Sequence, residues 1–128
     1  MSFPDAQLVT LAALRDRAAD EATYGTKFPD EYPEGEAPAL PYVVVRAGPT
    51  SLRWPVLAVA TMRLTAYADT EAEAVDLAWR LARVLLDCPG NAALRSFGAD
   101  FGPVPASDPD TGAPLCSFTV AARLRPTP

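Results

Sequence analysis

The segment with the strongest pattern for chemistry contains Asp108, Asp110 and Gly112, whose spacing resembles the start of a calcium-binding loop. Such a loop ends with a glutamate that binds the ion through both carboxylate oxygens. Here the position six residues after the glycine is Phe118, so that ligand is missing. Aspartate and glycine around a proline are also typical of a tight turn. We therefore predict a turn at residues 108–112, and no metal or other cofactor.

Other groups that often take part in catalysis lack the partners they need. The chain has no histidine, which removes the commonest general base and metal ligand. Serine and cysteine are present, but the usual activation of these nucleophiles needs a base. The carboxylates of residues 30–36 lie in a proline-rich stretch, which is a poor scaffold for a pair of catalytic acids. There is also no glycine-rich phosphate-binding motif. The sequence favours a protein that is not an enzyme.

Two further clusters are candidates for protein contacts. Arg53 and Trp54 lie near the tip of an expected hairpin and are residue types favoured as interface anchors. Trp54 folding back onto the sheet is an equal alternative. Arg123 and Arg125 are expected on one side of a strand, where they could meet an acidic partner or simply be solvated. The candidate contact residues are therefore Arg53, Trp54, Asp108, Asp110, Arg123 and Arg125.

Length and composition indicate one globular domain. At 128 residues with 49% apolar side chains, the chain can form a sizeable core, and we expect one domain over residues 1–128. The net charge of −5 and a single lysine argue against binding nucleic acid over the whole surface, which needs clustered cations. The N-terminus lacks a basic start and an apolar signal core, and the longest apolar stretch is too short to cross a bilayer. We expect a cytoplasmic protein without membrane contact.

Hydrophobic periodicity predicts two helices and four or five strands. One helix is expected from Pro4 to about Asp20 with Ser2 as a candidate cap, and another from a Thr70 cap to about Asp87. Strands are expected near residues 24–28, 41–47, 56–68, 91–105 and 116–125. This order predicts an α+β fold, with one mainly antiparallel sheet of four or five strands and both helices packed on one face.

Three details of these elements are specific predictions. Residues 48–51 are expected to form a turn, so that residues 42–67 make a hairpin with an extended tip. Phe97 and Phe101 are expected on one side of their strand, together with Arg95 and Ala99. In the last strand, alternate residues from Cys116 to Leu124 are expected to face the core.

The second expected helix is apolar over more of its surface than a sheet can cover. Its charged residues form one narrow stripe, in which Asp76 and Arg80 are spaced to pair. A helix that covers a sheet needs an apolar stripe only a little over ~100° wide. We expect the first helix or another subunit to cover the rest.

Over essentially its full length, the chain resembles the tail terminator proteins of long-tailed bacteriophages, especially those that infect actinobacteria. Four segments carry the resemblance. They are the first helix with residues 24–29 (YGTKFP), residues 41–46 (PYVVVR) with Gly48, the strand and helix over residues 64–86, and residues 102–125 with their turn at 108–112. The chain departs from the family pattern at Gly48-Pro49, where paired glycines would be expected.

The resemblance implies a structural virion protein at the head-proximal end of the tail. Such proteins form a hexameric ring on the last ring of the major tail tube protein and end tube polymerisation at the length set by the tape-measure protein, which is a further candidate partner. They also present a surface to the head-completion or stopper protein, and DNA passes through the ring without specific binding. Two alternatives stay open: another neck component, such as a head-completion or stopper protein, and a small cellular binding module.

Overall fold

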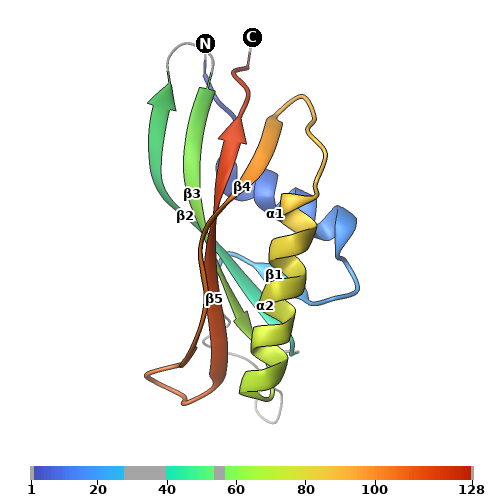
Figure 1. Cartoon of the computed structure of the whole chain (residues 1–128), viewed down its shortest axis with the longest axis vertical. Helices are drawn as coiled ribbons and strands as arrows, with labels where there is room; N and C mark the ends of the chain where they lie inside the picture. The colour runs from blue at the N-terminus through green and yellow to red at the C-terminus, as the bar shows by residue number, and fades with distance from the viewer. Residues whose placement is uncertain (1, 28–39, 54–56, 128) are drawn as a thin grey trace.

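The computed structural model describes residues 2–27, 40–53 and 57–127, which form two helices and one five-stranded sheet (Figure 1). In chain order the elements are α1 (Ala6–Arg17), β1 (Thr23–Gly25), β2 (Tyr42–Arg53), β3 (Leu57–Tyr67), α2 (Glu71–Leu86), β4 (Leu94–Ser107) and β5 (Pro114–Leu124). The strand order is β1-β2-β3-β5-β4, and only β1 and β2 are parallel neighbours. The predicted α+β fold with a mainly antiparallel sheet is confirmed.

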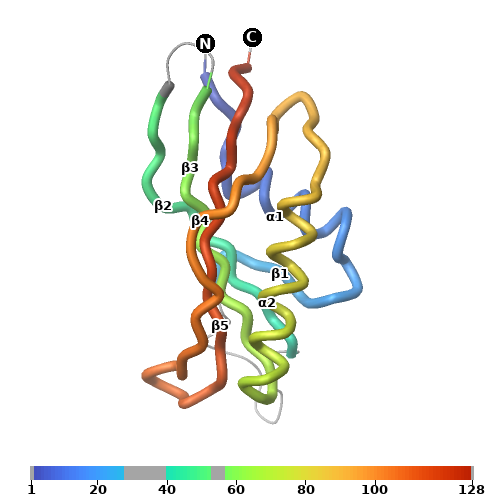
Figure 2. The backbone as a smooth tube through the Cα atoms, in the orientation of Figure 1, coloured from blue at the N-terminus to red at the C-terminus, as the bar shows by residue number. Residues whose placement is uncertain are grey.

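The core lies between the sheet and the two helices. Alternate side chains of β3 and β5 are buried with those of α1 and α2 in one cluster. α1 packs mainly on β2, while α2 packs mainly on β4 and β5 (Figure 2). Because side chains of a strand alternate between its two faces, the remaining residues of β3 and β5 form the opposite surface of the sheet, which we call the open face. The inward positions of β5 are those predicted: Cys116, Phe118, Val120, Ala122 and Leu124.

The first helix begins later than predicted because its cap is Asp5 rather than Ser2. The Asp5 carboxylate accepts hydrogen bonds from the backbone N–H groups of Gln7 and Leu8, at 2.9 and 3.1 Å. Ser2 lies beside the C-terminal segment, with its hydroxyl 2.6 Å from that of Thr127. A carboxylate at this position also favours the positive end of the helix, so the shift has a simple electrostatic reason.

Residues 48–51 are not a turn, which corrects the sequence-based expectation. β2 continues through them as far as Arg53, and its register with β3 shifts by one residue between Ala47 and Thr50. A bulge of this kind accommodates Pro49, which has no N–H to donate to the ladder. The two paired strands of the hairpin are therefore longer than predicted. Its tip, with Trp54, lies outside the described residues.

The two phenylalanines of β4 lie on opposite faces of the sheet, which is a second correction. Phe97 is buried in the core, whereas Phe101 is 69% exposed and pairs across the ladder with Thr119 of the open face. The register between β4 and β5 shifts three times, the last two shifts lying on either side of Phe101. Each extra residue reverses the facing of those that follow, because the side-chain period of a strand is two. No such shift is visible in the residue pattern.

Candidate interaction surfaces

The predicted contact residues that the structure describes lie at the two ends of the sheet, which are the top and bottom of Figure 1. Arg53 ends β2, level with the start of β3, and Arg125 follows the end of β5 nearby. The turn that contains Asp108 and Asp110 lies at the other end, beside Tyr67 at the end of β3. The full length of β3 separates the two groups. The five candidate residues that the structure describes therefore do not form one site, and Trp54 lies outside the described residues.

The predicted turn between β4 and β5 is confirmed, and Asp108 stabilises it from within. One Asp108 carboxylate oxygen accepts hydrogen bonds from the N–H groups of Asp110 and Thr111, at 2.8 and 3.2 Å. The other accepts from the Tyr67 hydroxyl at 3.4 Å. The backbone hydrogen bonds lower the pKa of Asp108, while burial, and then the Asp108 charge, raises the pKa of Tyr67. Asp110 is the exposed carboxylate of this turn.

The two ends of the sheet differ in charge. At the end with the β4–β5 turn, carboxylates of the turn and of the start of α2 gather. We call this the acidic end, and its residues are Asp69, Glu71, Glu73, Asp108 and Asp110. The opposite end, which we call the basic end, carries Arg95, Arg123 and Arg125. Lys27 also lies near the acidic end and Asp5 near the basic end, so the described charges show an excess of carboxylates at one end of the strands and of arginines at the other, not a complete separation.

Arg123 and Arg125 are not equivalent, although both were predicted on one side of the strand. The Arg123 guanidinium lies over Gly98, where a Cβ would come within 2.6 Å of Nη2. Its Nη1 also donates to the Ser96 hydroxyl at 3.3 Å. Arg125 lies beyond the end of β5 and is exposed. Arg125 is the more accessible of the two to a partner.

A hollow of about 360 Å³ lies on the open face, beside the irregular part of β4. Its apolar wall includes Phe101 and Val104, which are 69% and 44% exposed. Arg63 also lines it, and the β2–β3 register places Arg46 directly opposite Arg63. Like charges opposite one another destabilise a sheet. The Arg46 guanidinium, however, donates to the Thr26 carbonyl oxygen at 3.4 Å, on the side of β2 away from β3. A carboxylate also lies beside the hollow, since Asp100 accepts a hydrogen bond from the hydroxyl of the lining residue Thr119 at 2.8 Å. The open-face hollow is lined by Arg63, Phe101, Val104, Ala106, Leu115, Ser117, Phe118 and Thr119.

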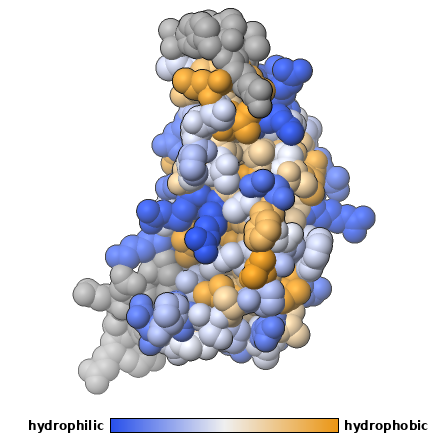
Figure 3. Space-filling view, turned by 60° about the vertical axis from the view of Figure 1, so that its left-hand side comes forward, coloured by the Kyte–Doolittle hydropathy of each residue, from blue (hydrophilic) through white to orange (hydrophobic). Residues whose placement is uncertain are grey.

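A second apolar surface remains on α2. Val75, Trp79, Ala82 and Leu86 are spaced three or four residues apart, so they lie on one side of the helix. Trp79 is 60% exposed and Leu86 43% exposed. We call these four residues the α2 stripe. These residues belong to the part of α2 that we predicted from the sequence to need a covering surface in addition to the sheet. Figure 3 brings the left-hand side of Figure 1 forward. On that side of the molecule, too, exposed apolar groups lie among strongly polar ones.

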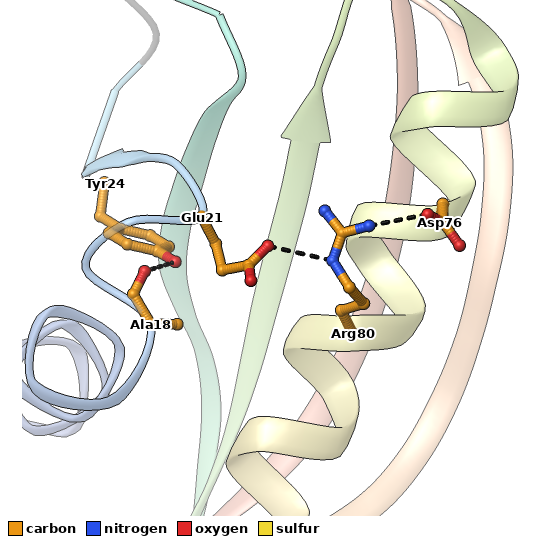
Figure 4. A network of polar contacts seen from close by, with 5 residues as sticks. All are labelled: Ala18, Glu21, Tyr24, Asp76 and Arg80. Carbon is orange, nitrogen blue, oxygen red and sulfur yellow. Dashed lines mark hydrogen bonds and ion pairs between the residues drawn. The ribbon is translucent and has the colours of Figure 1, made fainter.

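The charged side of α2 faces α1 and the segment after it (Figure 4). Arg80 donates from Nε to Glu21 at 3.0 Å and from Nη1 to Asp76 at 2.7 Å, the latter being the predicted pair. Tyr24 donates its hydroxyl to the Ala18 carbonyl oxygen at 2.6 Å. Since α1 lies on the charged side of α2, the α2 stripe looks the other way, towards the edge strand β4.

Tyr24 leads to a prediction for alkaline stability. Burial, and then the charge of Glu21, raises the pKa of Tyr24 from 10.0 to about 12. The unfolded chain loses the Tyr24 proton near the ordinary pKa of 10.0, while the folded chain keeps it up to a pKa of about 12. The stability that the buried, protonated Tyr24 contributes is therefore complete below pH 10.0 and is lost as the pH rises from 10.0 to about 12. We expect a loss of about 2 kcal/mol, measured by urea unfolding at several pH values. Tyr24→Phe cannot titrate, so its loss should be smaller; an equal loss in both proteins would contradict the prediction.

Another hollow, of about 420 Å³, lies between α1 and the segment after α2. Its Asn91 side chain already accepts hydrogen bonds from the N–H groups of Ala93 and Leu94, both at 2.8 Å. Among the described residues, no three or more His, Cys, Asp or Glu side chains lie close enough together to hold a metal ion. No helix in the same residues is both long and apolar enough to cross a membrane.

Sequence reasoning missed the main features of the open face. Arg46 and Arg63 both occupy outward positions of neighbouring strands, but only the observed register places them opposite one another. Phe101 was expected to share a side with Phe97, and the register shifts of β4 separate them. The α2 stripe could have been recognised from the sequence. Trp79 and Leu86 are seven residues apart, so they lie on the same side of a helix.

Comparison with known proteins assigns no family. No family model matches the chain, and a search of curated proteins finds no match. The likeness to tail terminators therefore rests on the four sequence segments that carry it.

Proposed function

We propose that this protein is a structural virion protein that forms a hexameric ring at the head-proximal end of a bacteriophage tail. The ring caps the tail tube, ends its polymerisation and forms the joint to the head. The observation that carries this proposal is the polarity of the subunit. Its acidic end and its basic end are separated by the length of β3 and carry those predicted contact residues that the structure describes.

A joint between two different partners needs two different surfaces. If the strands of each subunit run roughly along the ring axis, all acidic ends lie on one side of the ring and all basic ends on the other. One side would then contact the major tail tube protein, and the other the head-completion or stopper protein. The net charge of −5 supports passage of DNA without specific binding, because like charges repel.

The test is the mass of the protein by light scattering over a concentration series, with and without purified tail tube protein. A hexamer, alone or only with tube protein, would support the proposal. A protein that remains monomeric and does not bind tube protein would contradict the proposal and favour the cellular binding module. Binding to the portal end of the head instead of the tube would favour the stopper protein.

Single charge reversals should separate the two sides of the ring. Asp110→Lys changes the acidic end, and Arg125→Glu changes the basic end; both side chains are exposed. We expect each variant to bind one of the two partners at least tenfold more weakly while the other partner binds normally, because opposed charges at an interface steer and select partners. Binding is measured with purified tube protein and stopper protein in separate titrations. If both variants weakened the same partner, the two ends would not serve different contacts.

A further inference from the structure

We infer that neighbouring copies of this chain contact one another through the α2 stripe of one copy and the open-face hollow of the next. This rests on the proposed ring and names the surfaces that close it. Contacts in a ring are heterologous, so each subunit must carry two different surfaces that fit one another.

The two surfaces match in their apolar centres. On the α2 stripe the large exposed groups are Trp79 and Leu86, and in the open-face hollow they are Phe101 and Val104. A tryptophan seated in an apolar hollow is a common anchor of protein interfaces. Arg63 at the edge of the hollow would lie against the indole ring, where a cation is attracted to the ring face.

The two surfaces also match in charge. The charged residue that lines the hollow is Arg63, while Arg46 donates to the Thr26 carbonyl oxygen on the other side of β2. The α2 stripe is preceded, one helical turn before Val75, by the exposed carboxylate of Glu71. Packing the stripe over the hollow brings this carboxylate towards Arg63.

The directions of the two surfaces are compatible with a small closed ring, including one of six copies. An α-helix turns about 100° per residue, so the centre of the α2 stripe lies about 115° from the centre of the residues that α2 buries against the sheet. The open face is the far side of that sheet, so the two surfaces of one copy also look about 115° apart. Successive copies in a closed ring of six are turned by about 60°, which requires surfaces about 120° apart.

A contact made by side chains fits this part of the sheet better than strand addition. β4 is the edge strand next to the α2 stripe, and an exposed edge can recruit a further strand. Pro103 and Pro105 lie within β4 and have no N–H to offer such a strand. We therefore expect the neighbouring copy to pack on side chains on either side of β4, and not to add a strand to its edge.

The first experiment uses the full chain under the condition in which the wild type forms its ring, alone or with tube protein. Trp79→Glu damages only the stripe, and Arg63→Glu damages only the hollow. Neither variant should form the ring by itself, as measured by light scattering, because each substitution disrupts one of the two surfaces at every contact between copies. An equimolar mixture should form dimers, since the intact hollow of W79E accepts the intact stripe of R63E. Leu8→Glu, at an exposed position on α1, is the matched control and should form the wild-type ring.

A second experiment does not depend on charge. Trp79→Cys and Val104→Cys are combined in one chain with Cys88→Ser, and the assembled protein is oxidised. Disulfides between neighbours should give a ladder of up to six linked chains on a denaturing gel, and neither single cysteine should give it. Dimers from W79C alone would show that stripe packs on stripe, which overturns the inference.

The outcomes separate this inference from the proposed function. A normal ring from both W79E and R63E, without the ladder, overturns the assigned surfaces and leaves the ring intact. Absence of any ring from the wild type overturns both. Urea midpoints equal to that of the wild type show that the exposed substitutions have not unfolded the chain.

Discussion

Replacing Leu81 by alanine should lower the free energy of unfolding by about 3 kcal/mol. Leu81 is fully buried and lies at the centre of the side of α2 that packs on the sheet. The substitution removes apolar contacts and leaves a cavity, because the sheet below and the neighbouring helical residues can close only part of the gap. Urea unfolding followed by circular dichroism measures the change.

Trp79→Ala is the matched control for this prediction. Trp79 lies on the same helix but is 60% exposed. Its replacement should change the free energy of unfolding by no more than about 0.5 kcal/mol. We expect it instead to weaken assembly of the ring. If Trp79→Ala destabilised the monomer as much as Leu81→Ala, the α2 stripe would be part of the core, and its role between subunits would be contradicted.

Replacing Gly102 by alanine should also lower the free energy of unfolding by about 3 kcal/mol. Gly102 has a φ of +88°, which L side chains rarely adopt. A Cβ there would lie 2.8 Å from the Ser117 carbonyl oxygen and 3.0 Å from Phe118 Cα, both backbone atoms that cannot move aside easily. The variant should also disturb the open-face hollow, because Gly102 lies between Phe101 and Val104 in the bulged part of β4. Urea unfolding measures the stability.

Gly112→Ala separates the two causes of this effect. Gly112 has a φ of +73°, but no atom lies within 4 Å of the position its Cβ would take. The backbone conformation alone should therefore cost about 1 kcal/mol, by the same measurement. A loss as large as that of Gly102→Ala would mean that the contacts with β5 are not what makes Gly102 necessary.

Several elements could be predicted from the residues because their causes are local. The Thr70 hydroxyl accepts a hydrogen bond from the Glu73 N–H at 3.2 Å, as its position before an apolar helix indicates. The alternation of β5 predicts its inward face, and the spacing of Asp76 and Arg80 predicts their ion pair. Each of these depends on residues within a few positions of one another.

Other features could not be predicted because they depend on pairing between distant segments. The bulge beside Pro49 and the three register shifts of β4 exist only relative to neighbouring strands. They decide that residues 48–51 continue a strand and that Phe101 leaves the core. The positions of the candidate contacts also depend on the fold, since only the strand order places Arg125 and Asp110 at opposite ends.

Local residue patterns were enough to predict the fold class, the two helices with their charged and apolar sides, and the turn at residues 108–112. Hydrophobic periodicity, capping and turn chemistry act over a few residues, so they can be recognised without the fold. Only the tertiary structure decided which apolar groups remain outside the core and which charges face one another. Burial and cross-strand pairing join residues that are far apart in the chain, and a shift of one residue reverses the face on which a side chain lies.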